Sequence, residues 1–268
     1  MLNAGQIAQF ETFGFIVLRG LFSPDEMSDL GREFDDVLDE AREGQPFVGG
    51  ARQTVMPFVE RREILTQMVA DDRIFGTLEQ LLGPGFWWTG SDGNLYVGDT
   101  GWHADRLQDQ TGQDHLPWDL ESIKTCFYFD PVDADTGCLR VIPGTHRQEA
   151  AEALEPIWRA GLDPDDTRYG VSGPEIPCAV LDSRPGDEAF FSQGMCHASF
   201  GGKAGRRMLA MSSIAKPTTD EHVDFLTRVY SRSIWALHPA DTWVAHGSPR
   251  IRGMVQPLVD LGFHTTKL

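Results

Sequence analysis

The stretch FWWTGSDGNLYV, residues 86–97, begins the part of the chain that decides the fold. It is short, rich in aromatic residues and interrupted by glycine and aspartate, and further runs of this kind follow it: ESIKTCFYFDPV, CLRVIP, CAVLDSRPGDEAFFSQ and RRMLAMSSI. Short strands separated by turn residues are typical of an antiparallel sandwich or small barrel, whereas a parallel sheet needs long crossover connections between its strands. The pattern therefore predicts a β-rich core over about residues 86–216.

The residues before this core, about 1–85, are expected to be mostly helical. Ser23-Pro24-Asp25-Glu26 is a strong helix start, with a capping serine, a proline at the first helical position and acids in the first turn. The helix that follows repeats apolar residues on one side. Shorter helices are predicted after Asn3 and over residues 60–82, and FIVLRGL (15–21) is expected to be a strand.

We therefore predict a mainly β fold with flanking α-helices, in a single domain over residues 1–268. The helical part covers about 1–85, the β core about 86–216, and a C-terminal extension covers 217–268. The pattern of the extension is ambiguous.

The composition excludes several classes of function. The chain has 268 residues, with 23 Lys and Arg against 40 Asp and Glu, for a net charge of −17. Such an acidic surface repels phosphate backbones and anionic lipid, so neither a nucleic acid nor a membrane is an expected partner. The chain shows no signal peptide, no apolar run of membrane-spanning length and no CxxC pair. We expect a cytoplasmic monomer or homodimer that acts on a small molecule.

The motif Gly101-Trp102-His103-Ala104-Asp105 is the sharpest chemical feature of the chain. Residues two apart on a strand point to the same face, so His103 and Asp105 can bind one metal ion together. An imidazole and a carboxylate are two of the three ligands in the facial triad of non-haem Fe(II) oxygenases. A His-x-Asp pair alone is weak evidence, and the third ligand must be a histidine from elsewhere.

His197 is the best candidate for that third ligand, because it closes the predicted strand AFFSQGMCH (189–197). Arg206 then opens the apolar strand RRMLAMSSI, and an arginine buried there needs an anionic partner. A small dicarboxylate suits the guanidinium fork, although a salt bridge to one of the protein's own acids would also satisfy it. Strand alternation puts Arg206 on one face and Arg207 on the other; it favours Arg206, and Arg207 stays open.

The order of these motifs resembles the phytanoyl-CoA dioxygenase family. The most specific match is TGCLRVIPGTHR (136–147), which lies between the His-x-Asp pair and the distal His and Arg. The opening, with a short helix, FGFIVLRGLFSPDEM and a longer helix, is also similar to the family, and the resemblance covers roughly residues 5–215. It implies a double-stranded β-helix (jelly-roll, cupin-like) core and an oxygenase that uses Fe(II), O2 and 2-oxoglutarate as co-substrate.

The resemblance also implies roles for individual residues. It makes His103, Asp105 and His197 the iron ligands, and Arg206 the clamp for the distal carboxylate of 2-oxoglutarate. Further co-substrate contacts are implied for Ser199, Asn94 and Phe127. The stretch ASFGGKAG (198–205) departs from the family, since it makes the spacing from His197 to Arg206 shorter than usual.

The implied reaction is hydroxylation of an unactivated C–H bond in a small molecule, or desaturation or ring formation, with release of succinate and CO2. A natural product or small metabolite is the expected substrate. A cupin-like metal enzyme that does not use 2-oxoglutarate and a non-catalytic binding protein are the alternatives. The expected pocket walls are residues 43–60, the loop 106–120 and parts of 146–175 and 217–250. Candidate arginines for an anionic substrate are Arg52, Arg61, Arg62, Arg106 and Arg168, although an ordinary surface position is favoured for each.

Overall fold

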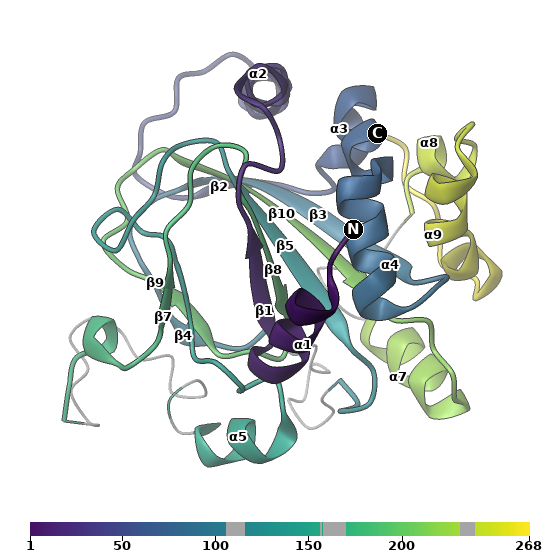
Figure 1. The fold of residues 1–268 in the computed structure, drawn as a ribbon. Helices are drawn as coiled ribbons and strands as arrows, with labels where there is room; N and C mark the ends of the chain where they lie inside the picture. Colours follow the sequence, from purple (N-terminus) through teal and green to yellow (C-terminus); the bar gives the residue numbers. More distant parts are fainter. Residues whose placement is uncertain (106–115, 156, 158–169, 231–238) are drawn as a thin grey trace.

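The computed structural model describes residues 1–105, 116–155, 157, 170–230 and 239–268, and it is built on two antiparallel sheets (Figure 1). The larger sheet has the strand order β1-β8-β5-β10-β3-β2, and the smaller has the order β4-β9-β6-β7. The strands are β1 (Phe15–Leu18), β2 (Gln53–Val55), β3 (Trp87–Tyr96), β4 (Thr100–His103), β5 (Ser122–Tyr128), β6 (Leu139–Val141), β7 (Ala179–Leu181), β8 (Glu188–Ser192), β9 (His197–Ser199) and β10 (Arg206–Ile214). This is the jelly-roll core with flanking helices that the sequence predicts.

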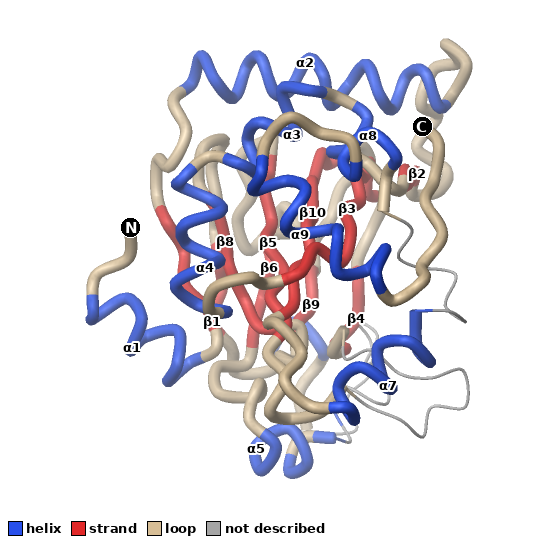
Figure 2. Tube along the Cα trace, turned by 90° about the vertical axis from the view of Figure 1, so that its right-hand side faces the viewer, coloured by secondary structure: helices blue, strands red, loops and turns tan. Residues whose placement is uncertain are grey.

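Helices cover the outer face of the larger sheet. They are α1 (Ala4–Phe13), α2 (Pro24–Ala41), α3 (Glu63–Ala70), α4 (Thr77–Leu82), α7 (Asp220–Tyr230), α8 (Asp241–Val244) and α9 (Pro249–Asp260), while α5 (Gln148–Ala153) lies apart from this layer. Figure 2 shows α4 and α9 in front of strands β5, β10 and β3, so the smaller sheet lies on the side away from these helices. None of the described helices is both long enough and apolar enough to cross a membrane.

The capping signals of the N-terminal helices work as predicted. At the start of α2 the Ser23 hydroxyl accepts from the Glu26 backbone N–H at 3.3 Å, and the Glu26 carboxylate accepts from the Ser23 N–H at 2.8 Å. This reciprocal pair satisfies two of the backbone donors that a helix start leaves free. The apolar stripe of α2 is buried against the sheet, as its spacing predicts: Met27, Leu30, Phe34 and Leu38.

The single helix predicted over residues 60–82 is wrong. The structure has a 3-10 turn at Val59–Arg61, α3, a π-helical turn at Asp72–Gly76 and then α4. The break lies at Asp71, whose backbone is extended and whose carboxylate accepts from the Arg73 N–H at 2.9 Å. Aspartate often competes with a helix in this way, because its side chain offers the backbone another hydrogen bond.

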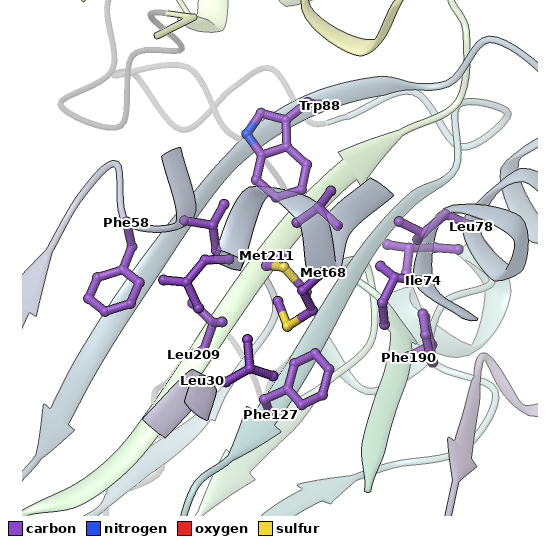
Figure 3. Close-up of a cluster of buried hydrophobic side chains, with 14 of the residues drawn as sticks. Leu30, Phe58, Met68, Ile74, Leu78, Trp88, Phe127, Phe190, Leu209 and Met211 are labelled. Carbon is purple, nitrogen blue, oxygen red and sulfur yellow. The ribbon is translucent and has the colours of Figure 1, made fainter. Parts of the chain in front are cut away.

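The strands of the larger sheet separate two interiors. Phe127, Phe190, Leu209 and Met211 point outward and pack with helix residues such as Leu30 (Figure 3). The alternate residues of the same strands point into the space between the sheets, where Cys126, Tyr128, Met208 and Ala210 form a second cluster. One face therefore builds the hydrophobic core and the other lines the barrel.

The C-terminal extension completes the helical layer. Trp243 of α8 packs on Trp88 of β3 with ring centroids 4.8 Å apart, and its indole N–H donates to the Thr66 hydroxyl at 2.8 Å. Trp88 is therefore a core residue, and its own N–H donates to the buried Glu60 at 2.8 Å. Part of the segment 217–250 thus supports the outer face of the sheet that lines the barrel.

Glu188 is an unusual member of the helix-covered core. It is fully buried opposite Phe127, and in the described part of the structure neither carboxylate oxygen has a well-formed hydrogen bond. Burial raises the pKa of Glu188 well above its ordinary value, and the neighbouring Thr125 hydroxyl offsets only part of this effect. The folded protein therefore holds this proton more tightly than the unfolded chain does.

Glu188→Gln should stabilise the protein increasingly as the pH rises. Below about pH 4 both states of the wild type are protonated, whereas above it the unfolded chain loses its proton and the folded protein keeps it until its raised pKa is passed. The wild type then loses up to about 1.4 kcal/mol per pH unit relative to the neutral variant. Urea denaturation between pH 4 and 8 measures the difference, with Glu79→Gln at an exposed position of α4 as control. A difference that is the same at every pH would contradict this assignment.

Candidate metal centre

His103, Asp105 and His197 converge at one end of the barrel. His103 ends β4 and His197 begins β9, and the two residues are direct partners in the antiparallel pairing of these strands. Their ring centroids lie 4.1 Å apart. The Asp105 carboxylate lies 3.5 Å from Nε2 of His103 and 3.4 Å from Nε2 of His197. The potential ligand atoms all lie within 4.8 Å of one another, as binding to one ion requires.

Two details of the sequence prediction for these ligands are wrong. β4 ends at His103, so Asp105 lies beyond the strand and does not reach the site by strand alternation. His197 does not close the strand 189–197, because β8 ends at Ser192 and a turn carries the chain across to the smaller sheet. The Thr145 hydroxyl accepts from the Cys196 N–H at 2.9 Å and so holds the backbone directly before β9.

The backbone orients both imidazoles. Nδ1 of His103 lies 2.8 Å from the Gly101 carbonyl, and Nδ1 of His197 lies 2.9 Å from the Met195 carbonyl. A carbonyl oxygen only accepts, so each Nδ1 carries the hydrogen and each Nε2 is left with a free lone pair. Two imidazole nitrogens and one carboxylate form a donor set that suits Fe(II), with coordination positions left over.

The charges of these groups also suit a metal. Burial opposes ionisation of Asp105, but the Lys124 ammonium outweighs it and holds the pKa of this carboxyl well below its usual range. Burial lowers the pKa of His197 and keeps its ring neutral. An ionised carboxylate and a neutral imidazole are the forms that bind a metal.

Lys124 is a member of this site that the sequence analysis missed. It lies on β5 and its ammonium forms an ion pair with the Asp105 carboxylate. A signal was present, because Lys124 falls on the same alternating face of the strand as Cys126 and Tyr128, which line the barrel. A lysine on a face expected to be buried marks a position to inspect.

Arg206 lies further along the barrel interior and is buried, with 6% of its surface exposed. One terminal nitrogen donates to the Ser199 hydroxyl at 3.0 Å, the other is 3.4 Å from the Thr136 carbonyl, and Nε has no partner in the described structure. Among the described residues no carboxylate lies within ion-pair distance of its guanidinium. Burial of such a charge is costly without an anion, so Arg206 is suited to bind one.

Arg207 has the opposite environment. It points out of the barrel and pairs with Asp130 at 2.8 Å and with Asp35 of α2 at 2.9 Å. These ion pairs tie β10 to α2. The alternation of β10 therefore gives the two neighbouring arginines different roles, with Arg207 in a structural one.

Two glycines leave the space that Arg206 occupies. At Gly137, where φ is +87°, a β-carbon would lie 1.7 Å from a terminal nitrogen of Arg206, and at Gly202 it would lie 2.4 Å away. Gly137 belongs to the stretch 136–147, and Gly202 to ASFGGKAG. The segment that departs from the usual family pattern thus contributes to the cradle of this arginine.

The structure contradicts one of the implied co-substrate contacts and leaves a second, Asn94, as a prediction. Phe127 faces the helices and packs on Phe22 with ring centroids 5.3 Å apart, so it cannot reach a ligand inside the barrel. Its neighbour Tyr128 is the residue that faces inward. Asn94 does face the interior, but its oxygen already accepts from Arg52 and Thr54. Its amide nitrogen donates to Asp92 at 2.6 Å. It therefore offers no free group.

The other candidate arginines differ in position. Arg52 stacks on the Tyr96 ring at 4.0 Å and lies 3.6 Å from the Asp92 carboxylate. Arg61 donates to the Pro57 carbonyl, and Arg62 pairs with Glu33 and Glu40, so both serve the helical layer. Arg106 and Arg168 lie outside the described residues, as do 106–115 and 158–169 of the expected pocket walls.

Comparison with known proteins gives one consistent relationship. The chain is 30% identical to dioxygenase FrzG from Cladobotryum sp, over 82% of this chain and 78% of that protein. It is 27% identical to ectoine dioxygenase from Bordetella bronchiseptica, over 74% of this chain and 70% of that one. The fold resembles HygX from Streptomyces hygroscopicus, solved with nickel and 2-oxoglutarate bound, with a TM-score of 0.61 and 16% identity over 82% and 89% of the two chains. The phytanoyl-CoA dioxygenase (PhyH) family model matches residues 10–208, and the protein belongs to this family.

Proposed function

We propose that the protein is an Fe(II)- and 2-oxoglutarate-dependent oxygenase that hydroxylates an unactivated C–H bond of a small molecule. The observation that carries the proposal is the pairing of two sites in one barrel. A His-Asp-His cluster lies at one end, and a buried arginine without a carboxylate partner among the described residues lies further in. Membership of the dioxygenase family supports the same conclusion.

The chain supplies a separate group for each task. His103 and His197 would hold the iron through Nε2 and Asp105 through a carboxylate oxygen, with positions left for the co-substrate and O2. Arg206 and Ser199 would bind the distal carboxylate of 2-oxoglutarate. Bound Fe(II), with O2 and 2-oxoglutarate, supplies the oxidant that converts C–H to C–OH, and the co-substrate leaves as succinate and CO2.

The interior between these two sites suits a small co-substrate. Ala210 pairs with Cys126, and Cys126 pairs with Ala189, across three adjacent strands. All three side chains belong to the interior cluster, so this row of the wall consists of short side chains. Short side chains leave room for a co-substrate that reaches from the metal ligands to Arg206.

The proposed substrate is a natural product or another small metabolite. A structural relative, the carbocyclase SnoK from nogalamycin biosynthesis (TM-score 0.60, 17% identity over 85% and 92% of the chains), makes a natural product or small metabolite a reasonable expectation. We further propose that the protein acts in the cytoplasm as a monomer or homodimer. Its four free cysteines suit a reducing compartment.

Anaerobic addition of Fe(II) and 2-oxoglutarate should produce a weak visible charge-transfer band, and admission of air should release succinate as O2 is consumed. His103→Ala should abolish both, because two ligands hold the metal poorly. His246→Ala is the matched control, since His246 pairs with Glu63 in the helical layer. Absence of the band in the wild type, or its survival in His103→Ala, would contradict the proposal.

Gly137→Ala should weaken binding of 2-oxoglutarate at least tenfold, because the new β-carbon displaces the Arg206 guanidinium. Gly144→Ala is a matched control in the same segment, with φ of +84° and nothing within 4 Å of the added carbon. Both variants pay a similar backbone strain of about 1–2 kcal/mol, so a difference in affinity between them reports on Arg206. Calorimetric titration with Co(II) in place of iron measures it. Equal affinities would contradict the role of Arg206, and absence of 2-oxoglutarate binding to the wild type would favour the cupin-like alternative.

A further inference from the structure

Lys124 lies at the metal end of the barrel, on its inner face. In the sheet it pairs with Phe191 of β8 and Ser212 of β10. The Phe191 ring in turn lies against His197, with ring centroids 5.1 Å apart. Lys124 therefore belongs to the same level of the barrel as the metal ligands.

Arg206 lies at the other end of the same wall. Lys124 is opposite Ser212, whereas Arg206 lies six residues earlier on β10. Ser199, the partner of Arg206, ends β9, whereas the ligand His197 begins it. Arg206 therefore holds the distal carboxylate of 2-oxoglutarate, whereas Lys124 lies at the metal end of the co-substrate.

Solvent reaches the end where Lys124 lies. The side chains of His103, Asp105 and Lys124 are 36%, 23% and 20% exposed, whereas that of His197, further in, is 7% exposed. We call this end, marked by His103, Asp105 and Lys124, the mouth of the barrel. A substrate that approaches the metal enters past these three side chains.

With Fe(II) and 2-oxoglutarate bound, the mouth of the barrel would carry one excess positive charge. Among the described residues, Asp105 is the only carboxylate within ion-pair distance of Lys124. The positive charges of Fe(II) and Arg206 together neutralise the negative charges of Asp105 and the 2-oxoglutarate dianion. The charge of Arg52 neutralises that of Asp92. The Lys124 charge is then left over beside the metal, where a largely desolvated ammonium without a full counter-charge is costly.

We propose that the primary substrate is a small anion, and that the Lys124 ammonium binds its carboxylate at the mouth of the barrel. The inference rests on the proposed function and narrows its substrate class. A carboxylate held there lies next to the metal and on its solvent side, so the bound anion positions a nearby C–H bond for oxidation. Lys124 is in this account a substrate-binding residue rather than only a support for Asp105.

The test uses acetate as the probe and acetamide as its neutral match. The protein is saturated with Co(II) and 2-oxoglutarate, and paramagnetic relaxation of the probe's methyl protons is followed by NMR. Acetate should bind saturably and acetamide should not. Lys124→Met should weaken acetate binding at least tenfold, Lys124→Arg should retain most of it, and Lys267→Met, at an exposed position, should change nothing.

The same samples separate the two proposals. The visible Co(II) spectrum reports the metal and 2-oxoglutarate in each variant, so its failure to respond to 2-oxoglutarate in the wild type would count against the proposed function. If the Co(II) spectrum responds to 2-oxoglutarate but acetate binds equally to the wild type and Lys124→Met, then the metal and not Lys124 binds acetate. That result would overturn the inference and leave the proposed function intact. Equal relaxation by acetamide would also overturn it. In turnover, acids should stimulate succinate release more strongly than their amides.

Discussion

The antiparallel pairing of β4 with β9 places His103 directly opposite His197, and the rest of the site depends on that pairing. His103 is the last residue of β4 and His197 is the first residue of β9, so the backbone pairing of the two strands brings the two imidazoles together. Each ring is then oriented by a carbonyl two residues earlier in its own chain segment. The carboxylate needs no strand of its own, since the Lys124 ammonium pairs with it.

The larger sheet supports this arrangement from behind. Its outward residues pack under the helices and its inward residues line the barrel, so one set of strands supplies both stability and chemistry (Figure 3). The neighbours Arg206 and Arg207 illustrate the division most clearly. One is buried inside with an unpaired nitrogen, while the other ties the sheet to α2 through two acids.

Much of this organisation could be predicted because it is local. The Ser23 cap, the α2 stripe, the β-rich runs and the His-x-Asp motif each depend on residues close in sequence. Two errors arose where distant contacts decide, because the end of β8 at Ser192 and the inward direction of Tyr128 rather than Phe127 depend on how segments pack. The break at Asp71 is local, but apolar periodicity does not reveal a side chain that competes for backbone hydrogen bonds. Lys124 was missed because its partner, Asp105, comes from a different segment of the chain.

The acidic composition also has a spatial meaning. Exposed acids of α2 and the helical layer account for part of the excess, whereas the barrel contains Arg206 and Lys124. A dianionic co-substrate thus meets local positive charge within a protein of net charge −17.

Anomalous diffraction from crystals grown anaerobically with Fe(II) and 2-oxoglutarate tests the central claim most directly. The account predicts one strong iron peak bounded by Nε2 of His103, Nε2 of His197 and the Asp105 carboxylate, with the distal carboxylate of 2-oxoglutarate on Arg206. An iron peak elsewhere, or a co-substrate whose distal carboxylate lies away from Arg206, would contradict it.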